Sequence, residues 1–370
     1  MYDVIIIGGG LAGLTNALVL GRAGLRVMLV EKKTYPFHRV CGEYISNETL
    51  PFLHSLGIRP HDWGASSINH LQVTAPNGRR LETRLDSGGF GISRYVLDYE
   101  LYQMVLAAGV TGITGKGVEE TAFGNDAFTI TLSDQSRHQA RFVIGAYGKR
   151  GKPDKQLNRE FIRKRSPYIG VKYHIRTDFP HNRIALHNFK DGYCGINAIE
   201  DGKFNLCYLT TRENLKQHGT IEAMEAETVY KNPFLRTIRD NADFLLDKPE
   251  VINEISFAPK KPVENHILMS GDTAGLITPL CGNGMAMAIH SAKILSGHLI
   301  SAHRENWPRQ RLEETYAAHW RRTFARRLWV GRHLQSLFGD EWLTDAAVRL
   351  LRTAKPVTRF LVRQTHGAEF

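Results

Sequence analysis

The chain contains 370 residues, of which 42% are hydrophobic and 23% are charged. This composition is typical of a globular protein of about two domains and excludes the disordered and fibrous classes, and no apolar stretch reaches the roughly 18 residues of a membrane span. The formal net charge of +11 raises nucleic acid, anionic membrane and anionic small molecules as partners. No nucleic-acid-binding motif is present, so we expect no nucleic acid partner.

The four cysteines are widely scattered and include no Cys-x-x-Cys pair, which predicts free thiols and no metal site. The apolar N-terminus is interrupted by three glycines and carries Asp3 where a signal peptide would carry positive charge. We therefore expect a cytoplasmic protein.

The first predicted elements form a β-α-β unit. Tyr2–Ile7 is rich in Val and Ile, Leu11–Arg22 has apolar residues at helical spacing, and Leu25–Glu31 is a second β-branched run. A unit of about 30 residues in this order predicts two parallel strands joined by a right-handed crossover.

The pattern then changes to short alternating strands. Asn77-Gly78 between two such segments is a strong hairpin signal, and no helical pattern separates the strands between Tyr168 and Thr210. In chain order we predict the hairpin Ile68–Thr74 and Arg80–Leu85, a helix over Tyr95–Ala108, the antiparallel pair Phe128–Leu132 and Ala140–Ile144, an antiparallel sheet over 168–210, helices over Glu213–Thr228 and Pro233–Asp240, a buried strand Ile267–Ser270, and mostly helix from Gly284 onward.

One motif lies between the first strand and the first helix. Gly8-x-Gly10-x-x-Gly13 is followed, 18 residues after Gly13, by Glu31 at the end of the next strand. Gly8 makes the tight turn, Gly10 lets the backbone approach a pyrophosphate, and Gly13 allows helix and strand to pack closely. Glu31 would accept hydrogen bonds from ribose hydroxyls and repel a 2′-phosphate, so the motif predicts a site for FAD or NAD rather than NADP.

Three segments resemble a known family. The start, from Asp3-Val4-Ile5 through Glu31, resembles the FAD-binding start of the flavoprotein hydroxylases related to p-hydroxybenzoate hydroxylase and of the geranylgeranyl reductases that share their fold. Arg94-x-x-Leu97-Asp98-x-x-Leu101 resembles the family helix whose arginine contacts FAD. Gly271-Asp272-Thr273-Ala274-Gly275, with Pro279 and Gly282-Asn283-Gly284-Met285, resembles the second FAD fingerprint, whose aspartate holds the ribityl chain. A helix that starts near Met285 would direct free N–H groups at the reduced flavin.

Cys41-Gly42-Glu43 resembles the geranylgeranyl reductase branch, in which this segment lies beside the isoalloxazine ring. We expect Cys41 to shape the flavin pocket, with an inert buried cysteine as the alternative. Arg39 would pair with phosphate or carbonyl groups of FAD. The cofactor-binding residues that the resemblance implies are Gly8, Gly10, Leu11, Ala12, Gly13, Glu31, Lys32, Arg39, Gly42, Arg94, Val118, Asp272, Pro279, Gly282, Asn283, Gly284 and Met285, and the catalytic candidates are Cys41, Glu43 and Tyr193.

The fold class that follows is α+β, with an α/β nucleotide-binding part: a Rossmann-like FAD domain of the glutathione-reductase type, an inserted antiparallel-sheet substrate domain and a helical C-terminus. We expect the FAD domain to consist of residues 1–66, 88–165 and 255–303, the substrate domain of 67–87 and 166–254, and the C-terminal helices of 304–370.

The sequence departs from the family at two places. Tyr147-Gly148 stands where the hydroxylases carry an Asp-Gly pair linked to FAD and NADPH binding, although the eight cations of Lys149–Arg165 would still receive a phosphorylated nicotinamide or an anionic substrate. After Tyr193, Gly195 and Asn197 replace the Trp and Phe of the geranylgeranyl reductase signature. The loss of two large rings predicts a wider pocket and a different substrate.

The first functional hypothesis is a monooxygenase that hydroxylates or epoxidises a lipophilic aromatic or polyene substrate through a flavin C4a-hydroperoxide, with FAD as cofactor and NAD(P)H or a separate electron donor as reductant. For a phenol substrate, the resemblance implies Glu43, His38 and Tyr193 as candidate bases. The alternative is a geranylgeranyl-reductase-like enzyme that adds hydride to a C=C bond of an isoprenoid or lipid, with Cys41 or Tyr193 supplying the proton.

The segment from Arg304 mixes four tryptophans with clustered arginines such as Arg321-Arg322. Basic amphipathic helices of this kind can lie on an anionic membrane, which would bring the protein to a lipophilic substrate. The alternative, which we favour, is that they pack on the parent domain and expose their arginines to water.

Overall fold

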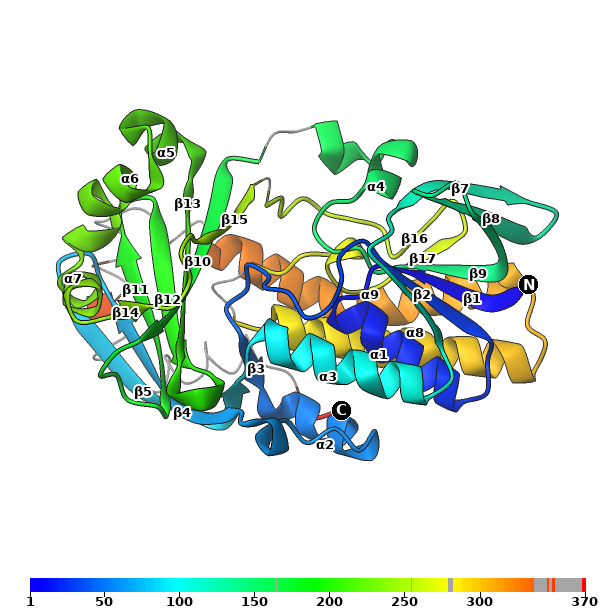
Figure 1. Cartoon of the computed structure of the whole chain (residues 1–370), viewed down its shortest axis with the longest axis horizontal. Coiled ribbons are helices and arrows are strands. Elements are labelled where there is room, and N and C mark those ends of the chain that lie inside the picture. The colour runs from blue at the N-terminus through cyan, green and yellow to red at the C-terminus, as the bar shows by residue number, and fades with distance from the viewer. Residues whose placement is uncertain (164–165, 254, 279–281, 336–344, 346–347, 350–367) are drawn as a thin grey trace.

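The computed structural model describes residues 1–163, 166–253, 255–278, 282–335, 345, 348–349 and 368–370. Within these residues the strands form two sheets, which lie in two halves of the molecule with helices packed against both (Figure 1). The N-terminal β-α-β unit and the predicted pair Phe128–Leu132 and Ala140–Ile144 belong to the first sheet, and the antiparallel strands predicted over 168–210 belong to the second.

The first sheet has the order β16-β17-β9-β1-β2-β6, with β8 pairing to β9 and β7 to β8. Its central pairs are parallel and buried on both faces, as expected for near-continuous Val and Ile runs. The predicted β-α-β unit is therefore confirmed. The strands are β1 (Tyr2–Ile7), β2 (Val27–Glu31), β6 (Thr111–Thr114), β7 (Val118–Gly124), β8 (Ala127–Leu132), β9 (Arg137–Gly145), β16 (Val263–Glu264) and β17 (Ile267–Met269).

Long helices cover this sheet and bring distant parts of the chain together. Helix α1 packs against α3 and α8, and α8 packs against α9. These helices lie on one side of β1 and β2 (Figure 1). Their bounds are α1 (Leu11–Arg22), α3 (Arg94–Ala107), α8 (Gly284–Arg304) and α9 (Arg309–Gln335), with the short α2 (Leu50–Ser55) and α4 (Lys152–Gln156) at the periphery.

The second sheet has the order β14-β10-β13-β12-β11-β4-β5-β3, and β15 also pairs with β10. Its pairs are antiparallel except β4 and β11, which run parallel. The hairpin predicted at Asn77-Gly78 joins β4 to β5, and Gly78 has φ +85°. The strands are β3 (Tyr44–Ser46), β4 (Ser66–Thr74), β5 (Arg80–Gly91), β10 (Tyr168–Arg176), β11 (Arg183–Phe189), β12 (Gly192–Ala198), β13 (Phe204–Thr211), β14 (Asp243–Phe244) and β15 (Glu250–Asn253).

The two faces of this sheet have different partners. Ile169, Val171, Tyr173 and Ile175 of β10 point to the outer face, where they pack with side chains from α5 (Arg212–His218), α6 (Ile221–Glu227) and α7 (Pro233–Asp240). The inner face lies toward the first half of the molecule (Figure 1). There a Cβ on Gly170 would meet Val40 at 3.3 Å, so alternate residues of one strand reach two different environments.

Helix α9 packs on the first half of the molecule through a row of buried side chains: Leu312, Tyr316, Trp320, Phe324 and Leu328. Among the described residues of α9, Trp329 is the large apolar side chain that stays exposed. No described helix is both long enough and apolar enough to cross a membrane. The fold class is as predicted, whereas the exact domain boundaries and the membrane contact stay predictions.

Candidate functional site

The glycine motif forms a tight turn between β1 and α1. A Cβ on Gly13 would lie 1.9 Å from the carbonyl oxygen of Gly8, so helix and strand approach as the motif requires. In the described chain no side chain caps the N-terminus of α1, and its first turn holds no acidic residue. Leu11 and Ala12 are buried at the start of the helix. Its first N–H groups and its positive dipole end remain available for an anion, which fits a pyrophosphate.

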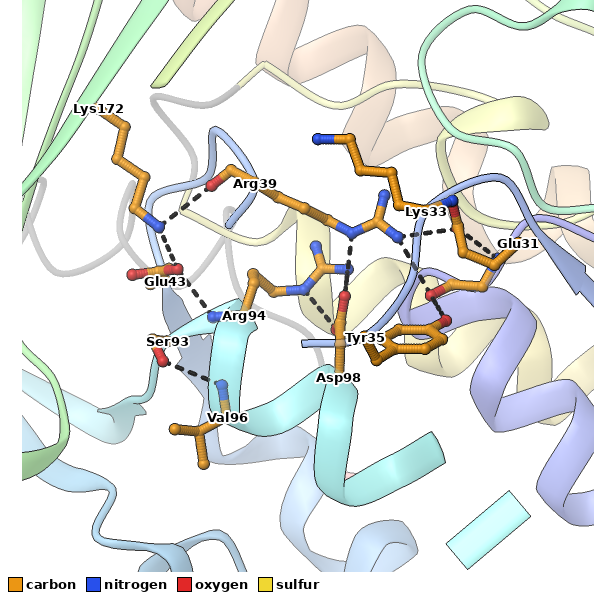
Figure 2. A network of polar contacts seen from close by, with 11 residues as sticks. Glu31, Lys33, Tyr35, Arg39, Glu43, Ser93, Arg94, Val96, Asp98 and Lys172 are labelled. Carbon is orange, nitrogen blue, oxygen red and sulfur yellow. Dashed lines mark hydrogen bonds and ion pairs between the residues drawn. The ribbon is translucent and has the colours of Figure 1, made fainter. Parts of the chain in front are cut away.

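Glu31 closes this turn at the end of β2. Its carboxylate accepts hydrogen bonds from the backbone N–H groups of Gly9 (2.9 Å) and Lys33 (3.1 Å). Arg39 donates to the same carboxylate at 3.0 Å and to the Gly9 carbonyl at 3.2 Å (Figure 2). Two further predicted cofactor residues lie close to each other near this turn. Lys32 follows β2 and is exposed, and Val118 is buried. Gly117, the residue before Val118, lies near Lys32, since a Cβ built on it would be 3.9 Å from the Lys32 Cβ.

Asp98 joins two of the predicted cofactor residues. Arg94, at the start of α3, donates to both Asp98 oxygens at 2.7 Å, and Arg39 donates to one of them at 3.0 Å. Burial disfavours the charge of Arg94, but Asp98 and then Cys41 outweigh it and raise the pKa of the guanidinium. Arg94, Arg39 and Glu31 therefore form one continuous polar network, drawn in Figure 2.

Glu43 lies at the centre of a buried cluster of charged residues. It has φ +51°, and its side chain is fully buried. One carboxylate oxygen accepts from Lys172 (2.5 Å) and from the backbone N–H of Arg94 (2.8 Å), and the other accepts from His174 (2.7 Å). Burial alone would raise the pKa of Glu43, but Lys172 and His174 lower it to about 2. The carboxylate is thus ionised at neutral pH and does not donate a proton there, and its catalytic role stays a prediction.

The neighbouring turn leaves space beside Gly42. A Cβ on Gly42 would meet no heavy atom within 4 Å among the described residues. The fully buried Asn205 of β13 donates to the Gly42 carbonyl at 2.9 Å, while its own Oδ1 has no hydrogen-bond partner in the described structure. An open backbone and an unpartnered buried acceptor fit a bound group with a polar N–H edge, such as a flavin ring.

Polar and apolar residues both line the inner face of the second sheet. One row runs from Lys172 through Cys207 and Gly195 to Leu186. A Cβ on Gly195 would meet its nearest neighbours at an ordinary contact distance of 3.7 Å, and this residue is half-buried where the reductase signature carries Trp. In the neighbouring row Tyr193 is buried with Leu209, Ile255 and Leu276.

The second glycine-rich segment follows β17. Burial raises the pKa of Asp272, with Lys149 and Lys260 opposing the shift. Lys260 donates to the backbone carbonyls of Lys149 and Asp272 at 2.8 Å each, and burial lowers its pKa to about 8. Lys260 was not a candidate from the sequence, since no motif contains it.

Helix α8 begins at Gly284, as predicted, and in the described chain no side chain caps its N-terminus. Asn283 donates to Glu48 at 3.3 Å, and a Cβ on Gly282, which has φ +62°, would meet the Tyr44 ring at 3.5 Å. Pro279 lies outside the described residues.

Tyr147 is held by a buried ion pair. Its hydroxyl donates to Asp154 at 3.0 Å, and Asp154 also accepts from Arg159 at 2.9 Å. Arg159 further pairs with Glu264 at 2.7 Å, and Lys152 pairs with Glu119. The cations of Lys149–Arg165 are therefore not one free basic surface, because Arg159 is buried and Lys152 is paired, while Lys164 and Arg165 lie outside the described residues.

Comparison with known proteins identifies the family. The model of the FAD binding domain family matches residues 1–330. The chain belongs to this family. It is 25% identical over 344 residues to digeranylgeranylglycerophospholipid reductase of Methanosarcina acetivorans, covering 87% of this chain and 81% of that protein. It is 22% identical over 335 residues to rifampicin monooxygenase of Streptomyces venezuelae, covering 86% and 68%.

A solved structure of the halogenase PltM in complex with phloroglucinol and FAD superposes with a TM-score of 0.75 at 17% identity, covering 98% of this chain and 85% of that one. At this identity the likeness supports the fold alone. Family membership makes the protein an FAD-dependent oxidoreductase, and the glycine turn, Glu31 and the two uncapped helix N-termini fit FAD.

Sequence reasoning missed Lys172, His174 and Asn205. Their strands alternate apolar and polar residues, a pattern that predicts a core-facing side and a solvated side. Instead the polar side is buried against residues 39–43 of the first half of the molecule. No local sequence signal identifies them, because Lys172 pairs with a carboxylate 129 positions away that only the fold brings close.

Proposed function

We propose that this protein is an FAD-dependent monooxygenase that hydroxylates or epoxidises a lipophilic aromatic or polyene substrate. The observation that carries the proposal is the half-buried Gly195 on the inner face, where the reductase signature has a large ring. Leu186 lies beside it, and the buried Tyr193 and Leu209 lie in the next row. This surface adjoins residues 39–43, which are the residues expected beside the flavin. A planar or chain-like apolar molecule fits such an apolar surface better than a charged molecule does.

When bound, FAD accepts reducing equivalents and, once reduced, activates dioxygen. The chain would hold its pyrophosphate at the α1 N-terminus and its ribose at Glu31, with Asp272 at the ribityl chain. The N-terminus of α8 would favour negative charge on the flavin. Leu186, Tyr193 and Leu209 would orient the substrate and exclude water, so no side chain has to act as a nucleophile.

The test is oxidation by the FAD-loaded, reduced protein of a long-chain alkylphenol under ¹⁸O₂, followed by mass spectrometry of the product. We expect one ¹⁸O atom in the product. Gly195→Trp places a large ring on the proposed substrate-facing surface and should lower product formation at least tenfold while FAD binding stays unchanged. A protein that binds no FAD, or that reduces O₂ without labelling any lipophilic aromatic or polyene, would contradict the proposal.

A second candidate is a reductase that adds hydride and a proton across a C=C bond of an isoprenoid or lipid. Cys41 favours it, because the thiol lies beside the Arg94 guanidinium in the turn expected to face the flavin and would supply the proton. Anaerobic transfer of reducing equivalents to geranylgeranyl lipid, with one solvent deuterium incorporated per double bond, would establish this reaction instead.

The electron donor in either reaction is expected to be NAD(P)H or a separate reductase. Tyr147 donates its hydroxyl to Asp154, so the position of the family carboxylate presents a ring and not an acceptor for ribose. The rate of flavin reduction by NADH and by NADPH distinguishes these sources from a protein donor.

A further inference from the structure

The charged cluster around Glu43 joins the two halves of the molecule. Lys172 and His174 come from β10 of the second sheet, whereas Arg39, Glu43 and Arg94 belong to the first half. Lys172 and Glu43 are both fully buried. A buried ion pair is costly to desolvate and is a weak source of stability, so the cluster calls for a role beyond holding the fold.

Lys172 fixes both ends of the segment from Arg39 to Glu43. Its ammonium group donates to the Arg39 carbonyl at 3.1 Å and to the Glu43 carboxylate at 2.5 Å. Asn205, on the neighbouring strand, holds the carbonyl of Gly42 between them. His174 contacts the other Glu43 oxygen, and Asn197 donates to the Glu43 carbonyl at 3.4 Å. The segment, which contains no helix or strand, is therefore positioned by contacts from the inner face.

The same segment reaches the cofactor residues at both ends. The Arg39 guanidinium contacts Glu31 and Asp98, and the Glu43 carboxylate accepts the backbone N–H of Arg94 at the first turn of α3 (Figure 2). Glu43 also has φ +51°, a conformation that non-glycine residues adopt only when contacts around them enforce it. The contacts that do so are those with Lys172, His174 and Arg94.

We propose that Lys172 is a positioning residue for the flavin half of FAD: it holds residues 39–43 in place from the substrate-facing sheet, so that the open face of Gly42 is presented to the ring. The inference rests on the proposed placement of FAD. Lys172 acts through Arg39, Gly42 and Glu43, and His174 supports it by holding the second oxygen of Glu43.

The experiment measures FAD and ADP binding to the full chain, freed of its cofactor, by fluorescence and calorimetry. ADP carries the part that the glycine turn and Glu31 would bind, and lacks the flavin. In the double variant Lys172→Met/Glu43→Gln, which leaves no unpaired buried charge from this pair, we expect the Kd for FAD to rise at least tenfold and the Kd for ADP to change less than twofold. The fine structure of the flavin absorption band should also be lost.

Two variants control for structural damage. Lys172→Arg keeps the cation and should bind FAD within threefold of the wild type. Tyr173→Phe alters the same strand on its opposite face, where the hydroxyl bonds to Glu225, and should leave both affinities unchanged.

Equal FAD binding by the double variant and the wild type would overturn the inference. A parallel loss of FAD and ADP binding, or a double variant that does not fold, would also overturn it, because Lys172 would then be needed for the fold and not specifically for the flavin. Failure of the wild type to bind FAD would instead overturn the proposed function.

Discussion

Strand β10 carries a buried carboxylate against each of its faces, and the two are stabilised in opposite ways. On the inner face Glu43 is held by an ammonium group and a histidine, and its pKa is lowered to about 2. On the outer face Glu225 is held by three tyrosine hydroxyls, from Tyr173, Tyr208 and Tyr230, and its pKa is raised because burial outweighs the three hydrogen bonds.

The difference shows what a buried carboxylate requires to stay charged. Hydroxyl donors satisfy its lone pairs but carry no net charge, so the cost of desolvation still favours the protonated form. A cation in contact with the carboxylate favours the charged form instead and lowers the pKa. The inner cluster therefore keeps a fixed charge at the boundary with the predicted cofactor residues. The outer cluster stabilises the packing of α6 on the sheet and takes no part in the proposed chemistry.

The largest expected effect is the loss of the cation at Glu43. Lys172→Met leaves an ionised carboxylate buried without its strongest partner, and breaking such a pair by removing one partner typically costs about 3–5 kcal/mol. Urea unfolding at pH 7 should show a decrease of this size in the free energy of unfolding. Adding Glu43→Gln should restore most of it, and a double variant no more stable than the single one would mean that the methionine, not the unpaired charge, is responsible.

Much of the first half of the molecule could be predicted from the sequence, and the polar part of the second could not. The turn at Gly8–Gly13 and the acid at Glu31 follow from local spacing, since each step of a β-α-β unit constrains the next. Contacts between Glu43 and Lys172 join residues 129 positions apart. Alternation along β10 predicted which residues share a face, but the burial of both faces depends on the packing of the two halves.

Asp98 illustrates the same limit within a recognised motif. Its spacing of four residues from Arg94 on α3 predicts an ion pair on one helix face. That Arg39, from a different segment, shares the same carboxylate follows only from the path of residues 33–41 over α3, where His38 stacks on Tyr95 and Tyr35 on Tyr102. The predicted cofactor residues were thus recognisable one by one, while the network that joins them was not.

The next largest effect is expected from lowering the pH, which should change the stability contributions of Glu43 and Glu225 in opposite directions. The pKa of Glu43 is lower in the folded state than its usual value of 4.5, so its contribution to stability is full above pH 4.5 and is lost as the pH falls toward 2, a change of about 3 kcal/mol. The stability advantage of the wild type over Glu43→Gln should shrink accordingly over this range. Glu225 has a raised pKa, so its contribution should fall as the pH rises above 4.5, and Glu225→Gln should remove that opposite slope.

The smallest effect is expected at the tyrosines of the outer face. Tyr208 donates to Glu225 at 2.7 Å, the shortest of the three hydroxyl contacts. Tyr208→Phe should cost about 1 kcal/mol, the usual net value of one hydrogen bond, because Tyr173 still donates to the same oxygen at 2.9 Å. Thermal unfolding with and without FAD measures the cost, and the stabilisation by FAD should equal that of the wild type. If Tyr208→Phe also weakened FAD binding, the outer cluster would influence the cofactor site through the sheet. The two faces of β10 would then not have separate roles.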